Sequence, residues 1–125
     1  MMTVITPEWP APDNVVAGTT TKLVPDGVLP TELQYLNQVH GAHVVSIDEV
    51  RRASAPIDAD AVTGRESGAH CAVRTADCLP VLFCAADGSE IAAAHAGWRG
   101  LLAGVIENTV AALRSDPASL MVWLG

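Results

Sequence analysis

The stretch that decides the fold is residues 78–100, which read CLPVLFCAADGSEIAAAHAGWRG. Its two apolar runs, 81–86 and 90–95, have the length of buried strands. Between them, Asp87 and Gly88 form a dipeptide that favours a two-residue type I′ turn, because both turn positions need a positive φ. The stretch therefore predicts an antiparallel β-hairpin.

The turn also fixes the register of this hairpin. With two residues at the tip, Pro80 pairs with His95 and Cys78 faces Gly97. Residues that are directly opposed, or two apart on one strand, share a face of the sheet, so Cys78 and His95 lie diagonally on one face. Such diagonal positions are about 7–8 Å apart, within reach of long side chains.

A thiol beside an imidazole supports two kinds of chemistry. The imidazole of His95 can hold Cys78 as a thiolate nucleophile. Alternatively, both groups can bind zinc, and a third protein ligand with one open position would make a catalytic centre. The simpler alternative is a buried cysteine that packs beside a histidine bonded to the backbone. Spacing alone leaves these three interpretations open.

A helix is predicted after the hairpin. Apolar residues recur with helical spacing over 98–114, and Pro117 cannot continue the pattern. Small residues flank the start of this helix, where unpaired N–H groups and Arg99 together predict an anion site. A final buried strand is predicted at 120–124.

The rest of the chain predicts shorter elements. Strands are predicted at 15–20, 35–39, 43–47 and 72–75, and a polar connection at 51–57. Strands followed by a helix and a strand indicate an α+β fold of mixed α/β layers, with a mixed β-sheet whose central hairpin packs on helices. No linker or repeat divides the sequence, so residues 1–125 are interpreted as a single domain.

Composition narrows the classes of function. The 125 residues are 50% hydrophobic, and 7 basic against 14 acidic residues give a net charge of −7. Among the basic residues only Arg51 and Arg52 are adjacent, so neither nucleic acid nor an anionic membrane is expected as a partner. The sequence predicts no membrane span and no signal peptide, and three cysteines without a CxxC pair indicate the cytoplasm.

Six further polar or sulfur-bearing residues are predicted to be structural. Asp58 and Asp60 are assigned to a turn, His43 and His70 to the surface or to strand ends, and Cys71 and Cys84 to the core.

Three blocks in the sequence carry a family resemblance. They are NQVHG at 37–41, TADCLPVL at 75–82 and AHAGWRG at 94–100. In this order they resemble the signature blocks of the YfiH family, whose members are called laccase-domain or multicopper polyphenol oxidase proteins, purine nucleoside phosphorylases and peptidoglycan editing factors. The resemblance extends over about residues 35–125, with a weaker match at 8–22. It implies a fold related to that of the CNF toxins, bacterial proteins that deamidate with a Cys–His pair.

The resemblance implies a metal centre and an activity. By motif match, His40, Cys78 and His95 would bind one metal, zinc with copper as the alternative, and leave an open position. The implied activity is phosphorolysis of adenosine, inosine and methylthioadenosine, with adenosine deamination as a second reaction. The implied partners are therefore a purine nucleoside and phosphate.

Neighbouring residues are expected to assist. Arg99 is expected to bind phosphate, Gln38 to contact the substrate, and Asp77 to act with Cys78 and His95 as a base or as support for the ligand strand.

Two departures from the family pattern concern the first third of the chain. Lys22 stands where the family usually has arginine, and the two residues differ in how they bind anions. The Gly-rich stretch usual between Lys22 and Tyr35 is missing. The chain is therefore expected to be a shortened, partial form of the family domain.

Three other functions stay open at this point. One is a metal-free hydrolase or amidase in which Cys78 is the nucleophile and His95 the base. The second is a copper-dependent polyphenol oxidase. The third is a non-enzymatic partner that edits peptidoglycan precursors.

Overall fold

The computed structural model describes residues 4–21 and 27–125, and Lys22 lies outside them. The main sheet has the strand order β3-β4-β6-β5-β7, and β1 pairs with β2 in a separate sheet. The strands are β1 (Val4–Ile5), β2 (Thr19–Thr20), β3 (Val44–Ser46), β4 (Ala61–Gly64), β5 (Leu79–Ala85), β6 (Ile91–Ala96) and β7 (Leu120–Leu124). The helices are α1 (Ile47–Arg52), α2 (Trp98–Ala103) and α3 (Val105–Ala112), with a 3₁₀ turn at Pro117–Ser119. β3 and β4 are parallel and the other pairs antiparallel, which confirms the predicted α+β fold with a mixed sheet.

The predicted hairpin is β5–β6, and its register is confirmed because Pro80 pairs with His95. The predicted type I′ turn is wrong. Gly88 has a φ of 75°, but Asp87 is not among the described residues with positive φ. Instead, the Gly88 N–H donates to the Ala85 carbonyl at 2.9 Å. The loop is longer by one residue on each side, which leaves the register unchanged.

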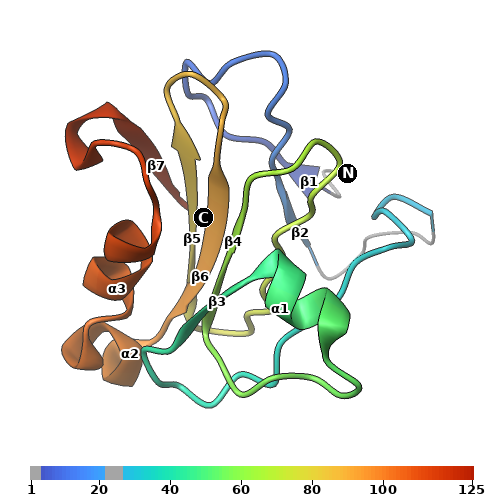
Figure 1. Ribbon diagram of the computed structural model, residues 1–125, viewed down its shortest axis with the longest axis vertical. Helices are drawn as coiled ribbons and strands as arrows, with labels where there is room; N and C mark the ends of the chain where they lie inside the picture. The colour runs from blue at the N-terminus through green and yellow to red at the C-terminus, as the bar shows by residue number, and fades with distance from the viewer. Residues whose placement is uncertain (1–3, 22–26) are drawn as a thin grey trace.

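Both faces of the main sheet are covered (Figure 1). Side chains alternate along β6, so that Ala92, Ala94 and Ala96 belong to the core under α3, whereas Ala93 belongs to the core under α1. The first core also contains Val81, Phe83, Val105 and Leu113, and the second contains Leu36, Val45, Ile47, Val50 and Val62. A central strand of alanines fits a position covered on both sides, since short side chains leave room for the two layers.

The prediction of one continuous helix over 98–114 is wrong, because the chain forms two helices. Gly104 separates α2 from α3 with a φ of 94°, a left-handed conformation that glycine adopts without strain. Its N–H still donates to the Gly100 carbonyl at 3.0 Å, so it closes α2 before the chain changes direction. The turn lets Val105 enter the core, where it is fully buried.

The first half of the chain has fewer strand residues than predicted. Of the predicted strand 15–20 only Thr19–Thr20 is paired, and 72–75 forms no strand. The predicted strand 35–39 contributes an isolated bridge between Asn37 and Asp58. In contrast, the final strand occupies 120–124 as predicted. The predicted burial of this strand is wrong, because β7 lies at the edge of the sheet, and Val122 and Leu124 are 49% and 61% exposed.

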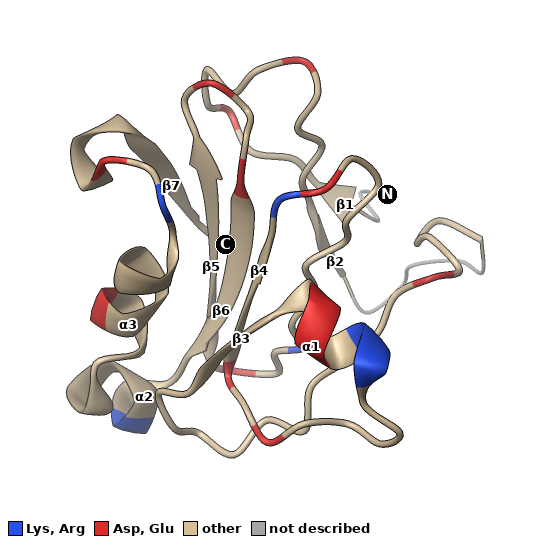
Figure 2. Cartoon of the chain, in the orientation of Figure 1, with Lys and Arg blue, Asp and Glu red and all other residues tan. Residues whose placement is uncertain are grey.

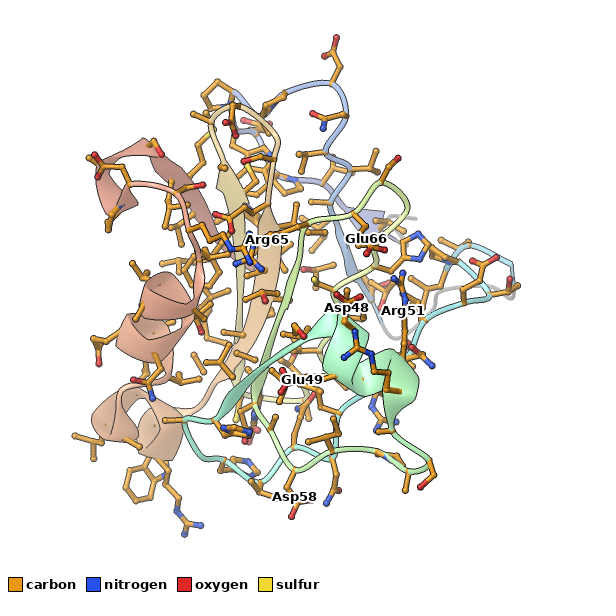
Figure 3. All side chains as sticks on the ribbon, viewed as in Figure 1. Asp48, Glu49, Arg51, Asp58, Arg65 and Glu66 are labelled. Atoms are coloured by element: carbon orange, nitrogen blue, oxygen red, sulfur yellow. The ribbon has the colours of Figure 1, made fainter. Side chains whose placement is uncertain are left out.

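Helix α1 and strand β4 were not predicted from the sequence. Ser46 Oγ accepts the Glu49 N–H at 3.2 Å, and the Glu49 carboxylate accepts the Ser46 N–H at 2.6 Å. This capping box begins α1 inside the predicted strand 43–47. At the other end of α1, Arg51 contacts Glu66 at 3.3 Å and so ties the helix to the loop after β4 (Figure 3).

The basic residues are fewer than the acidic ones and are scattered over the fold (Figure 2). Figure 2 shows the basic residues at separate places, on α1, at the end of β4, on α2 and before β7. Among the described residues, no helix is long and apolar enough to cross a membrane.

A buried carboxylate anchors the end of the sheet near the hairpin loop. Glu90 is 3% exposed and accepts hydrogen bonds from Arg65 Nε at 2.8 Å, the N–H groups of Arg114 and Ser115, and the Ser115 hydroxyl at 2.6 Å. Burial alone would raise the pKa of Glu90, but the hydrogen bonds from Arg114, Ser115 and Arg65 outweigh it and lower that pKa. Glu90 thereby joins β4, β6 and the chain after α3.

We expect Glu90→Gln to lower the free energy of unfolding by about 2–3 kcal/mol. The NH2 group of the glutamine would face N–H donors that the Glu90 carboxylate now accepts. Urea unfolding at pH 7 measures this. Glu66→Gln is the matched control, because Glu66 is exposed and should change stability by less than about 0.5 kcal/mol.

The same variant tests the pH dependence of stability. Because the folded pKa of Glu90 lies below its ordinary value of 4.5, its contribution is complete above that value and is lost as the pH falls through the folded pKa. Glu90→Gln should therefore flatten the acid limb of the stability curve. An unchanged acid limb would contradict the assignment.

Candidate metal centre

Three side chains meet at the open end of the β5–β6 hairpin. The ligand atoms of His40, Cys78 and His95 lie within 4.8 Å of one another, the one such group of metal-binding side chains among the described residues. The rings of His40 and His95 meet edge to face, with 4.9 Å between their centroids. His95 is 3% exposed, Cys78 is half-buried and His40 is exposed, so the cluster opens to solvent beside His40.

The hairpin register brings Cys78 to His95. Cys78 directly precedes β5, whose first pair joins Leu79 to Ala96, so the thiol lies beside Gly97. A Cβ at Gly97 would lie 2.9 Å from Cys78 Sγ, closer than such atoms approach in proteins. The missing side chain at Gly97 therefore leaves the space that the thiol occupies.

His40 reaches the cluster from a loop that Asp60 holds. The backbone of His40 is left-handed, with a φ of 61°, which is uncommon for a residue with a side chain. The carboxylate of Asp60 accepts the N–H groups of Val39, His40 and Gly41 at 3.1, 3.0 and 3.0 Å. Three bonds to consecutive N–H groups fix the loop in this conformation.

The same carboxylate contacts the second histidine. Asp60 Oδ2 lies 2.7 Å from His95 Nδ1, and the two backbones are joined by a bond from the His95 N–H to the Asp60 carbonyl at 2.7 Å. Burial alone would raise the pKa of Asp60, but the hydrogen bonds from His95 and from the N–H groups of Gly41, Val39 and His40 outweigh it and lower that pKa. Because its two oxygens accept three backbone N–H groups, Asp60 faces Nδ1 of His95 as a hydrogen-bond acceptor.

Asp60 does lie in a bend before β4, but it is more than a turn residue, because its side chain is 0% exposed and is bonded to the loop of His40 and to the ring of His95. Asp58 lies in the loop before β4 (Figure 3). Its carboxylate accepts a hydrogen bond from Asn37 Nδ2 at 2.6 Å. A sequence signal was available, since Asp60 directly precedes a buried run, Ala61–Gly64. A carboxylate that begins a buried strand needs donors around it.

Asp77 lies beside the cluster, and Arg99 follows Gly97 in the chain by two positions. Asp77 is exposed, and its Oδ1 is 3.9 Å from Cys78 Sγ, within the range of a thiol hydrogen bond. Arg99 is exposed in the first turn of α2, with its guanidinium carbon 5.1 Å from the centre of the Trp98 ring. Trp98 itself is 69% exposed, so both side chains are accessible to a ligand.

Gln38 is occupied by the backbone in this structure. Its Nε2 donates to the Arg74 carbonyl at 2.6 Å, and its Oε1 accepts the Arg74 N–H at 2.8 Å. Arg74 also lies over the ring of Tyr35, 4.6 Å from its centre. Gln38 thus ties the His40 segment to the segment that leads to Cys78, and its predicted contact with substrate stays a prediction.

The remaining predicted structural residues lie apart from the cluster. His43 is exposed next to β3, Cys84 is buried in β5, and Cys71 packs against the core under α1, as expected for each. His70 is half-buried, on a segment that forms no strand. All three cysteines are free.

An apolar cavity lies apart from the cluster. It has a volume of about 680 Å³ and lies between the β1–β2 segment and the sheet, where Trp9, Tyr35 and Leu82 line it. Pro80, the pairing partner of His95, also lines it, but the three clustered side chains do not. The cluster is therefore reached from the solvent beside His40 rather than through this cavity.

The donor set fits a metal ion. Two imidazoles and a thiolate are ligands that zinc accepts, and three protein ligands leave the fourth tetrahedral position open. The bond from Nδ1 of His95 to Asp60 leaves Nε2 as the ligand atom. Copper also binds imidazole and thiolate, so the geometry fits this class of metal.

Residues 12–125 match the family model described as multi-copper polyphenol oxidoreductase laccase. The chain belongs to this family. A crystal structure of a Neisseria meningitidis protein of family DUF152 superposes on it with a TM-score of 0.84 and 38% identity, over 99% of this chain and 62% of that chain. The predicted resemblance to the YfiH family is thus confirmed.

Curated relatives in this laccase-like family carry the name purine nucleoside phosphorylase. The Escherichia coli (strain K12) protein "Purine nucleoside phosphorylase YfiH" is 39% identical over 156 positions, which cover 100% of this chain and 63% of the relative. A Xylella fastidiosa (strain Temecula1) relative is 48% identical over 100 residues, which cover 78% of this chain and 38% of the relative. The chain thus spans less than two thirds of these relatives.

The space at Gly97 makes a direct test of the metal centre. Gly97→Ala places a methyl group against Cys78 Sγ, so we expect zinc affinity to fall about tenfold or more, as measured by competition with a chromophoric chelator. Gly41→Ala is the matched control, because a Cβ there makes only ordinary contacts of 3.7 Å or longer. Equal zinc affinity in the two variants would contradict the predicted ligand role of Cys78.

Alkylation should separate Cys78 from the other two thiols. Burial raises the pKa of Cys71 to about 12 and also raises the pKa of Cys84, so both stay as unreactive thiols at pH 7.5. We expect iodoacetamide to modify Cys78 first in the metal-free protein and zinc to protect it, as followed by peptide mass spectrometry. Cys78→Ser should remove the fast phase, and a fast phase at Cys71 would contradict this expectation.

Proposed function

We propose that this chain carries the metal centre of a purine nucleoside phosphorylase that acts on adenosine, inosine and methylthioadenosine. The observation that carries the proposal is the cluster of His40, Cys78 and His95, three metal-binding side chains with an open side. The names of the relatives support the same reaction class. We place the activity in the cytoplasm, where three free thiols stay reduced.

Phosphorolysis needs a site that binds two anionic or polar partners side by side. A phosphate oxygen forms a bond to C1′ of the ribose, the bond from C1′ to N9 of the purine breaks, and the purine leaves with a proton. His40, Cys78 and His95 would hold the metal, which would supply a Lewis acid for a substrate oxygen or a water at the open position. Adenosine deamination, the proposed second reaction, would use the same open position for a water that adds to C6 of the purine while ammonia leaves.

The residues around the cluster receive roles from their positions. Arg99 is exposed two positions after Gly97 and is proposed to bind phosphate, since its planar group matches phosphate oxygens. Asp77 is proposed to take the proton of the Cys78 thiol, since its Oδ1 lies 3.9 Å from Cys78 Sγ. Gln38, whose amide group is bonded to the backbone of Arg74 in this structure, is proposed to contact the substrate.

Two other functions have observations in their favour. The chain of contacts from Asp60 through His95 to Cys78 has the order of acid, base and nucleophile, which favours a metal-free Cys–His hydrolase. The family's description and a donor set of two histidines and one cysteine favour copper-dependent oxidation of phenols.

The decisive experiment incubates the zinc-loaded chain with adenosine, with and without phosphate, and separates the products by chromatography. We expect adenine and ribose 1-phosphate only with phosphate, and a slower formation of inosine without it. His40→Ala and Cys78→Ala should lower both zinc content and turnover by about 100-fold or more. His43→Ala, an exposed histidine three positions from His40, should leave both unchanged.

The other outcomes identify the alternatives. Activity that survives a chelator but is lost in Cys78→Ala would identify the hydrolase. Oxidation of a phenol by the copper-loaded chain, with adenosine untouched, would identify the oxidase. Binding of a muramyl precursor by a chain that leaves adenosine unchanged would identify a non-enzymatic editing role and overturn the proposal.

A further inference from the structure

We propose that Asp60 is a positioning residue that sets both histidines of the cluster at once, His95 through its ring and His40 through its backbone. The inference rests on the proposed metal centre, and it concerns a residue whose sequence pattern indicated only a turn. Its support is the hydrogen bonding of a single buried carboxylate.

Each oxygen of this carboxylate has a different task. Oδ2 accepts the His40 N–H at 3.0 Å and lies 2.7 Å from Nδ1 of His95, so one atom touches both histidines. Oδ1 accepts the N–H groups of Val39 and Gly41, which flank His40. With an exposed fraction of 0%, the carboxylate has no competing water to replace a lost bond.

For His95, the carboxylate selects the tautomer. Both oxygens of this carboxylate accept backbone N–H groups, so the carboxylate faces the ring as an acceptor, and the facing Nδ1 carries the proton. Nε2 then keeps its lone pair for a metal ion. An asparagine cannot replace this function fully, because its amide nitrogen would face N–H donors wherever its oxygen faces the ring.

For His40, the carboxylate holds an unfavourable backbone. The φ of 61° is uncommon for a residue with a side chain, and three successive N–H bonds to Asp60 maintain it. This conformation aims the His40 ring at His95, with 4.9 Å between the centroids. Cys78 makes no bond to Asp60 and contacts Asp77 instead. Loss of Asp60 should therefore disturb two of the three ligands and spare the third.

The structure contains a matched control for this inference. Glu90 is also a buried carboxylate that accepts several N–H bonds, but it lies at the other end of β6 and touches none of the three ligands. Asp60→Asn and Glu90→Gln therefore remove the same kind of charge from the same kind of site. Only the first should change the metal centre.

The test uses cobalt(II) as a spectroscopic probe of the intact chain. We expect Asp60→Asn to weaken zinc and cobalt affinity 10- to 100-fold, with altered d–d bands but a retained sulfur-to-cobalt charge-transfer band from Cys78. Asp60→Glu should restore part of the affinity. Glu90→Gln should bind both metals as the unmodified chain does, when compared at equal folded fraction.

Nitrogen-15 NMR of the metal-free chain tests the inference separately from metal binding and turnover. His95 should carry its proton on Nδ1 in the unmodified chain and lose this preference in Asp60→Asn. If the chain binds no metal but His95 has this tautomer, the proposed function fails and the positioning role stands. A proton on Nε2 in the unmodified chain, or unchanged metal spectra in Asp60→Asn, would overturn the role of Asp60.

Discussion

The pairing of β6 with a strand on each side is the constraint on which the rest of the molecule depends. On one side, β5 places Pro80 opposite His95 and brings Cys78 to Gly97. On the other side, β4 pairs Ala61 with Ala94, which puts Asp60 beside His95. One histidine in the centre of the sheet thus meets a thiol from one neighbour and a carboxylate from the other. Strand register therefore places three residues of the candidate site, His95 within β6 and Cys78 and Asp60 directly before β5 and β4, and a separate loop adds His40.

Two buried carboxylates, Glu90 and Asp60, lie at opposite ends of β6 and have different roles. Glu90 and Asp60 both lose bound water on folding. In both, hydrogen bonds from backbone N–H groups and from one charged or titratable side chain replace that water. Their partners differ in consequence. Glu90 binds Arg65 and the chain after α3, which are structural segments. Asp60 binds the segment and the ring that form the metal centre. A buried carboxylate that accepts several N–H groups thus stabilises the fold at the Glu90 end of β6 and the candidate site at the Asp60 end.

The sequence predicts those parts of the structure that local rules decide. The hairpin register follows from the length of the loop, and His40, Cys78 and His95 follow from motif blocks once the family resemblance is noticed. Asp60 could not be placed in this way, because its role needs the parallel pairing of β3 with β4 and the left-handed loop at His40. The break between α2 and α3 was missed for a related reason, since periodicity ignores the positive φ that Gly104 adopts. The capping box at Ser46 was readable in the sequence, but the β-branched residues before it favoured a strand.

The backbone of His40 has a consequence for how such a site can change over time. A left-handed residue with a side chain carries a conformational cost of about 1 kcal/mol or more, which glycine would not carry. Replacement of His40 by glycine would therefore remove this conformational cost, but it would also remove a proposed metal ligand. Selection for stability and selection for metal binding act here in opposite directions. A lineage that no longer needed the metal would be expected to lose this histidine early and to gain a more stable fold by doing so.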